Sequence, residues 1–84
     1  MKNLTQILEE NNFTLNGANE VSISHYFDTE DEAFDTLKNI NELSFVFISM
    51  VIDKSNAIFF FSINNLDVKT ISETILSIQS SISI

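Results

Sequence analysis

The chain has 84 residues and a net charge of −8, because twelve acidic residues face only four lysines and there is no arginine, cysteine or proline. This length predicts a single domain over residues 1–84. A negative chain without arginine repels nucleic-acid phosphates, which argues against direct binding to DNA or RNA. The lack of cysteine excludes thiolate catalysis, disulfide bonds and cysteine-ligated zinc.

The composition also bears on where the protein resides and how stable it is. The absence of disulfides, and of an apolar leader segment after Met1 and Lys2, predicts a cytoplasmic protein. The charge-free run over residues 43–52 is only half the length of about 20 residues that a transmembrane helix needs. A chain this short buries only about 60–65% of its unfolded surface, so an oligomer or a bound partner would add stability.

The first third of the chain predicts a helix, a loop and a strand. Leu4, Ile7 and Leu8 lie on one face of a helix over residues 3–11, and Asn3 with Gln6 fits a capping box at its start. Residues 13–19 contain the single glycine and predict a loop or a short extended piece. Residues 20–27 alternate apolar and polar side chains, which predicts a half-buried strand.

A second helix is expected to begin after Thr29. Thr29 and Glu32 have the spacing of a capping box, and the acidic residues of the first turn suit the positive end of the helix dipole. The predicted buried stripe consists of Ala33, Phe34, Leu37 and Ile40.

The apolar segment 43–52 predicts the strongest strand, with apolar side chains on both faces and a central place in the sheet. One face holds Leu43, Phe45, Phe47 and Val51; the other holds Val46, Ile48, Met50 and Ile52. Residues 53–56 predict a four-residue hairpin turn, and residues 57–63 predict the partner strand. The second and third helices are expected on one face of this hairpin, and the short first helix over part of the other.

The last third predicts a helix that Asp67 caps. Its apolar stripe consists of Val68, Ile71, Ile75, Ile78 and Ile82. From residue 77 onward serine and isoleucine alternate, which also fits a strand and has poor helix propensity. We therefore expect a helix to about residue 77 or 80, followed by a short extended tail. For residues 78–84 the sequence fits either a helix or a strand.

These elements predict an α+β fold in which helices pack on a small, mainly antiparallel sheet, in the order α-β-α-β-β-α. From the first strand onward the order is β-α-β-β-α, which is a ferredoxin-like half with its last strand short or missing.

The side chains that could take part in catalysis do not favour an enzyme. His25 is the only side chain that titrates near neutral pH, and with Tyr26 and Asp28 it offers a cluster for proton transfer. No nucleophile elbow, glycine-rich turn or arginine accompanies it, and no metal-ligand spacing or calcium-loop pattern occurs in the sequence. We therefore expect no catalytic residues, no metal and no cofactor, with His25 as a half-exposed strand residue.

Acidic residues concentrate between residues 28 and 42, where six carboxylates and Lys38 give five of the eight net negative charges. These side chains fit either a solvated, well-capped helix or a surface that imitates nucleic-acid phosphates and binds a basic partner. The candidate partner-binding residues are Glu20, Asp28, Glu30, Asp31, Glu32, Asp35 and Glu42.

The two-sided hydrophobicity of the hairpin gives a second candidate surface. Its side chains either lie under the helices or form part of an interface with a second copy or a partner. The candidate interface residues are Val46, Ile48, Met50, Ile58 and Phe60.

The sequence resembles the phage uracil-DNA glycosylase inhibitors over residues 1–65. The likeness consists of the opening segment 3–9, the strand that starts at Glu20, the acidic helix 30–37 and the hairpin that follows. The inhibitors have Glu-Ser-Ile on their first strand, whereas here Val21 separates Glu20 from Ser22, and the last third of this chain predicts a helix where they continue with strands. The resemblance implies a DNA mimic that blocks the DNA-binding groove of a repair enzyme.

Two functions therefore compete. The first is a small acidic inhibitor or adaptor, of the kind that phages and mobile elements carry, which binds a basic, nucleic-acid-binding host protein by charge mimicry. The second is a small homodimeric regulatory or ligand-binding module with a ferredoxin-like or ACT-like sheet.

Overall fold

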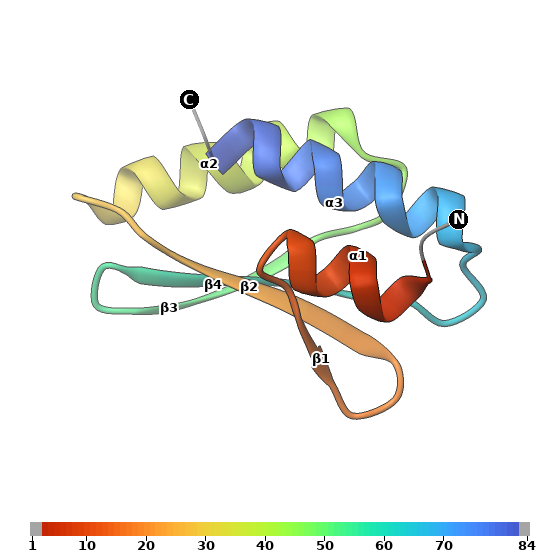
Figure 1. Ribbon diagram of the computed structural model, residues 1–84. Coiled ribbons are helices and arrows are strands. Elements are labelled where there is room, and N and C mark those ends of the chain that lie inside the picture. Colours follow the sequence, from red (N-terminus) through yellow and green to blue (C-terminus); the bar gives the residue numbers. More distant parts are fainter. Residues whose placement is uncertain (1–2, 83–84) are drawn as a thin grey trace.

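The structure is a computed structural model that describes residues 3–82, and it has three helices packed on one four-stranded antiparallel sheet (Figure 1). The elements are α1 (Leu4–Glu10), β1 (Thr14–Asn16), β2 (Glu20–Tyr26), α2 (Glu30–Leu43), β3 (Ser49–Asp53), β4 (Asn56–Ser62) and α3 (Val68–Ile82). The strands are arranged in the order β1-β2-β4-β3. The predicted α+β class is confirmed.

The central part of the sheet has the predicted ferredoxin-like half. β4 lies between β2 and β3, and all strand pairs are antiparallel. The fourth strand is β1, which comes from the segment 13–19 and pairs with the outer side of β2. Gly17, in the three-residue connection to β2, has a φ of 63°, a conformation that glycine adopts without steric cost.

The helices begin where their capping residues predict. The Gln6 N–H donates to Asn3 Oδ1 (2.9 Å) and the Asn3 N–H donates to Gln6 Oε1 (3.1 Å), so the capping box of α1 is confirmed. Thr29 Oγ1 accepts from the Glu32 N–H at 3.2 Å, and Asp67 Oδ1 accepts from the Thr70 N–H at 2.8 Å. Each bond satisfies a donor that the first turn of a helix leaves unpaired.

The expectation of a central strand over residues 43–52 is wrong. The α2 helix continues to Leu43, residues 44–48 form a connection, and β3 starts at Ser49 as an edge strand. β2 and β4 take the two inner places of the sheet, and all seven residues of β2 pair with β4. The predicted four-residue turn is also shorter than expected, since Asp53 pairs directly with Asn56 and Lys54 takes a positive φ of 60°.

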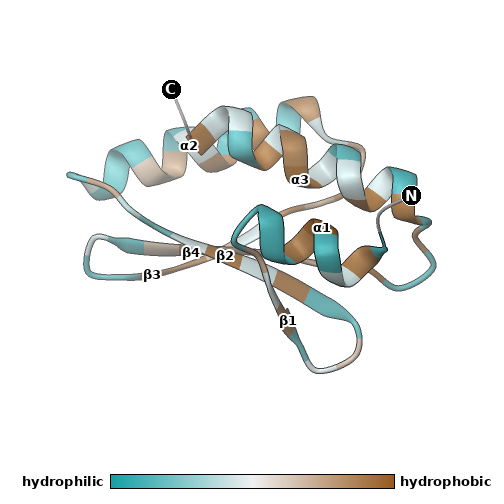
Figure 2. Cartoon of the chain, in the orientation of Figure 1, coloured by the Kyte–Doolittle hydropathy of each residue, from teal (hydrophilic) through white to brown (hydrophobic). Residues whose placement is uncertain are grey.

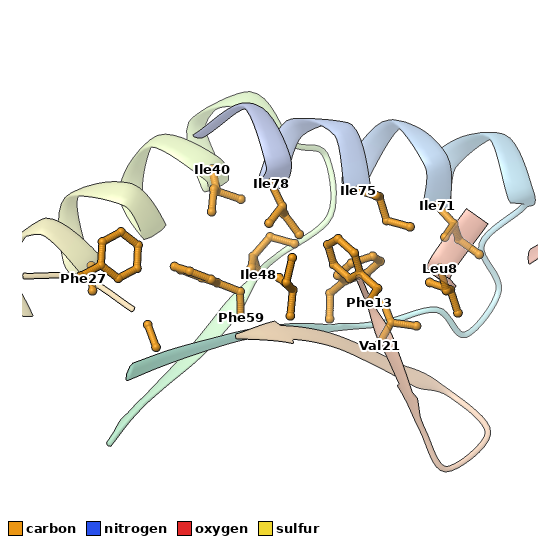
Figure 3. Close-up of a cluster of buried hydrophobic side chains, with 14 residues drawn as sticks. Leu8, Phe13, Val21, Phe27, Ile40, Ile48, Phe59, Ile71, Ile75 and Ile78 are labelled. Atoms are coloured by element: carbon orange, nitrogen blue, oxygen red, sulfur yellow. The ribbon is translucent and has the colours of Figure 1, made fainter. Parts of the chain in front are cut away.

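All three helices cover the same face of the sheet, so the expectation that α1 lies on the other face is wrong (Figure 1). Leu8 of α1 shares one core with Val21 and Phe59 of the sheet and with Ile75 of α3 (Figure 3). α1 joins this core because the chain turns back at once into β1, beside β2.

Two further expectations about the helices need correction. The predicted buried stripe of α2 includes Phe34, but Phe34 is 54% exposed, whereas Ala33 and Ile40 of the same stripe are buried. The α3 helix continues through Ile82, where an extended tail was expected. Ile78 is fully buried and Ser81 is nearly so, which shows that packing on the sheet overrides the poor helix propensity of the Ser-Ile sequence. Residues 83–84 of the expected tail lie outside the described residues.

The second face of the sheet is not covered by any described helix. The side chains of Ser22 and Ser24 on β2, Val51 on β3, and Ile58 and Phe60 on β4 belong to this open face, because they alternate with the buried residues of the same strands. The open face is therefore polar at Ser22 and Ser24 of β2 and has an apolar patch of Val51, Ile58 and Phe60 in the middle of β3 and β4, with polar residues at the strand ends.

Candidate partner-binding surfaces

The end of β2 and two helices enclose an open groove of about 400 Å³. Asp28, Glu32 and Asp35 line this groove, and Tyr26 stands at its border with 68% of its surface exposed. The other lining residues are His25, Phe27, Thr36, Asn39, Ser81 and Ile82. We call this the acidic groove.

The helical repeat of α2 explains why these carboxylates meet. Glu32, Asp35, Thr36 and Asn39 follow the spacing i, i+3, i+4 and i+7, which places them along one side of a helix. Figure 2 shows hydrophilic residues gathered at the N-terminal turn of α2. The same turn carries Glu30 and Asp31, so five exposed carboxylates lie at this end of the molecule.

The other two predicted acidic residues lie elsewhere. Glu20 is the first residue of β2 and Asp28 follows its end, so about 20 Å of strand separates them. Glu42 lies at the far end of α2, about 18 Å from Glu30 along the helix axis. The seven predicted acidic residues therefore form one cluster of five and two isolated carboxylates.

Few cations balance the cluster. Within residues 3–82, Lys38 forms no ion pair with any of the five carboxylates, although it is on the same helix. Lys69 pairs with Glu73 on the exposed surface of α3 at 4.0 Å. The acidic groove therefore keeps its negative charge available to a partner.

The histidine cluster is brought together only in part. His25, Tyr26 and Asp28 all line the acidic groove, but no hydrogen bond joins these three side chains in the described part of the chain. The His25 ring is half-buried and packs edge-on against Phe27, with 4.8 Å between the ring centroids. Phe27 in turn contacts Phe59 in the core, so the histidine ring is held by packing.

The five predicted interface residues do not form one surface. Ile48 is fully buried in the core (Figure 3). Val46 and Met50 are partly buried and pack against that core. Ile58 and Phe60 lie on the open face of the sheet. Successive residues of a strand point to opposite faces of the sheet. Met50 pairs with Phe59 on the core side, whereas Phe60 pairs with Ser49 on the open face.

A different apolar surface borders β3. Phe45 is fully exposed, Phe47 is 77% exposed, and Val51 is 52% exposed. Phe34 faces the same side of α2 as Asn41, which lies seven residues further on and contacts Ile48. Phe45 lies instead beside α3, where it lines a small groove with Thr70 and Thr74. We call Phe34, Phe47 and Val51 the β3 edge surface. The sequence pattern grouped Phe45, Phe47 and Val51 on one face, but it could not show that this face lies outside the core.

Residues 3–82 lack a metal-binding cluster and a membrane-spanning helix. No three histidine, aspartate or glutamate side chains are grouped closely enough there to hold a metal ion. None of the helices in the same range is both long and apolar enough to cross a membrane.

No protein-family model, curated protein or solved structure matches this chain.

Proposed function

We propose that this protein is a small acidic inhibitor or adaptor that binds a basic, nucleic-acid-binding protein through the acidic groove. The observation that carries this proposal is that Asp28, Glu32 and Asp35 line one open groove, and that no lysine of the described chain pairs with them. The resemblance to phage glycosylase inhibitors suggests the same class of mechanism, in which carboxylates take the place of nucleic-acid phosphates.

The groove suits a cationic side chain of the partner. An arginine or lysine that enters it meets the carboxylate of Asp28, just after β2, and those of α2, and the exposed Tyr26 ring offers a face for a cation–π contact. Long-range attraction between this end of the molecule and a basic surface would speed association and make it sensitive to salt.

The test compares two variants with the same net charge. The groove variant carries Asp28→Asn, Glu32→Gln and Asp35→Asn. The control variant carries Glu9→Gln, Glu20→Gln and Glu42→Gln, all exposed and away from the groove. Each variant has a net charge of −8 + 3 = −5. Any difference between them then reports the position of the charges and not their number.

Each immobilised protein is exposed to the heparin-binding fraction of a bacterial lysate, and retained proteins are identified by mass spectrometry. We expect the wild type and the control variant to retain the same nucleic-acid-binding proteins at low salt and to release them at high salt, whereas the groove variant retains none. The proposal fails if the wild type retains no such protein, or if the groove variant behaves like the wild type.

A homodimeric regulatory module is the second candidate. The strand order β2-β4-β3, with helices on one face only, supports it, because this arrangement leaves a whole sheet face and an edge strand available. Analytical ultracentrifugation and melting temperatures across a metabolite panel test it. A monomer whose melting temperature no metabolite raises would contradict this function.

A further inference from the structure

The outer edge of β3 presents unpaired backbone groups. At the two ends of the β2–β4 pair, the Phe27 N–H donates to the Ser55 carbonyl (2.9 Å) and the Ile63 N–H donates to the Asn19 carbonyl (2.7 Å). Successive residues of a strand point their backbone N–H and carbonyl groups to opposite neighbours. These two bonds therefore show that Asn56, Ile58 and Phe60 of β4 direct their backbone groups towards β3.

The residues of β3 alternate in the same way. Ser49, Val51 and Asp53 bond to β4, and Met50 and Ile52 direct their N–H and carbonyl groups outward. The next outward residue, Ile48, is already paired, because its N–H donates to Asn41 Oδ1 (2.8 Å) and its carbonyl accepts from Asn41 Nδ2 (3.0 Å). Within residues 3–82, Met50 and Ile52 are therefore the residues of this edge whose outward backbone groups have no hydrogen-bond partner.

This edge lacks the features that usually protect an edge strand. Natural edge strands carry lysine, proline or a bulge that prevents pairing with another chain. Here the chain has no proline, and the one charged residue of β3 is Asp53 at its end, after a charge-free run from Leu43 to Ile52. The exposed side chains beside the edge are apolar instead, namely those of the β3 edge surface.

We propose that β3 pairs antiparallel with β3 of a second copy of this chain, so that two four-stranded sheets join into one of eight strands. In the register that uses only the free groups, Met50 of each copy bonds to Ile52 of the other, which gives four backbone hydrogen bonds. Val51 then lies directly opposite Val51 of the second copy, beside the two-fold axis.

The distribution of charge favours a second copy as the occupant. Each chain carries −8, so two copies can approach only where neither bears negative charge, and residues 43–52 are such a segment. In the proposed register Ser49 faces Asp53 of the other copy, so no two carboxylates lie opposite each other. Antiparallel pairing also places the two acidic grooves at opposite ends of the joined sheet.

The apolar area beside the edge fits a weak dimer. A covered aromatic side chain buries about 150–250 Å². With the observed exposures, Phe34, Phe47 and Val51 offer roughly 350 Å² per copy, or about 700 Å² in total, which is below the usual size of a stable interface, so the four backbone hydrogen bonds carry much of the contact. The contact is independent of the acidic groove and needs no ligand.

A cysteine scan tests the register, because the natural chain has no cysteine. In a non-hydrogen-bonded antiparallel pair the Cα atoms are about 4.5 Å apart, which a disulfide can bridge. We expect Val51→Cys to form a covalent dimer under mild oxidation. Ser49→Cys is the matched control on the same strand face, since its equivalent in the other copy is about 13 Å away, but it should cross-link to Asp53→Cys when the two variants are mixed.

A charge exchange gives a second readout in solution. Val51→Lys and Val51→Glu should each be monomeric by analytical ultracentrifugation, because like charges would meet at the axis, and an equal mixture should restore the dimer. Val51 is half exposed in one copy, so both variants should keep the wild-type circular dichroism spectrum.

A wild type that stays monomeric up to about 1 mM would overturn the proposal, as would a Ser49→Cys variant that cross-links to itself as readily as Val51→Cys. Salt should strengthen this dimer by screening the repulsion between two negative chains, whereas it should weaken binding to the acidic groove. A monomer with groove-dependent capture would reject the dimer alone. A dimer without such capture would reject the proposed function alone.

Discussion

Asn41, near the C-terminal end of α2, holds the backbone at the start of β3. Its side-chain amide makes two hydrogen bonds to the backbone of Ile48 and so substitutes for a neighbouring strand at the start of β3. We expect Asn41→Ala to lower the free energy of unfolding by about 1–3 kcal/mol, because the buried Ile48 backbone loses both partners. Urea unfolding measures this loss.

Asn39→Ala is the matched control, since Asn39 is exposed on the groove side of the same helix. Its effect should stay within about 0.5 kcal/mol. Equal effects of the two substitutions would show that the amide of Asn41 does not hold β3.

Asp67 should contribute to the response of stability to acid. Hydrogen bonds from Thr70 lower the pKa of the Asp67 carboxyl below its ordinary value of 3.8. A lowered folded-state pKa means that the stabilisation is present above the ordinary value and is lost as the pH falls through the lowered pKa.

Asp67→Asn keeps an oxygen acceptor for the Thr70 N–H but removes the charge at the N-terminus of α3. We expect a lower melting temperature at neutral pH and a smaller loss of melting temperature on acidification below about pH 3.8. Glu42→Gln is the control, because Glu42 lies near the C-terminal end of α2, where a negative charge is unfavourable. A melting temperature that Glu42→Gln lowers as much as Asp67→Asn does would contradict this account.

At the scale of the elements, the two faces of the hairpin have different roles. Ile48 is fully buried beneath the helices, whereas Ile58 is on the open face. We expect Ile48→Ala to cost about 2–5 kcal/mol in unfolding free energy, since it leaves a cavity in the core, and Ile58→Ala to cost less than about 1.5 kcal/mol. Denaturant titrations at low protein concentration compare the two, and similar losses would show that the open face is covered in the monomer.

The α2 helix separates the two candidate surfaces. One of its sides contributes Glu32 and Asp35 to the acidic groove, and its other side carries Phe34 and Asn41 beside β3. The helix buries Ala33 and Ile40 in the core and packs Leu37 against it, so Glu32, Asp35 and Phe34 can be substituted with little effect on packing. Asn41 is the exception, because its side chain holds the backbone of Ile48.

At the scale of the whole molecule, net charge should limit stability. A charge of −8 on a compact chain repels itself, and salt screens this repulsion. We expect the melting temperature to rise by a few degrees between low and physiological ionic strength, since 1 kcal/mol shifts it by about 4–8 °C in a domain of this size.

The groove variant should show a smaller rise than the control variant, because its three neutralised carboxylates lie close together. Measurement at low protein concentration separates this effect from dimer formation. A melting temperature that falls as salt is added would show that attractive ion pairs outweigh the repulsion.

The sequence was sufficient to predict helix starts and strands where interactions between neighbouring residues decide the local structure. Asn3, Thr29 and Asp67 each cap the helix that was predicted to follow them, because a cap depends only on residues a few positions away. The alternation along residues 20–27 and 57–63 predicted two strands for a similar reason. One failure is at residues 43–48, an apolar run that forms the end of α2 and a connection where a strand was predicted. The other is at residues 78–82, where isoleucine and serine fit a helix or a strand equally well and only packing decides.

The sequence by itself determined the α+β class, the excess of negative charge near α2 and the charge-free segment before β3, since these depend on composition and periodicity. Only the tertiary structure decided that Asp28 meets Glu32 and Asp35 at one groove, that Ile48 is buried while Phe47 is exposed, and that β3 is an edge strand. Strand order and the choice of the covered face arise from contacts between distant segments, and the hydrophobic pattern of a strand with two apolar faces does not specify which face the helices cover.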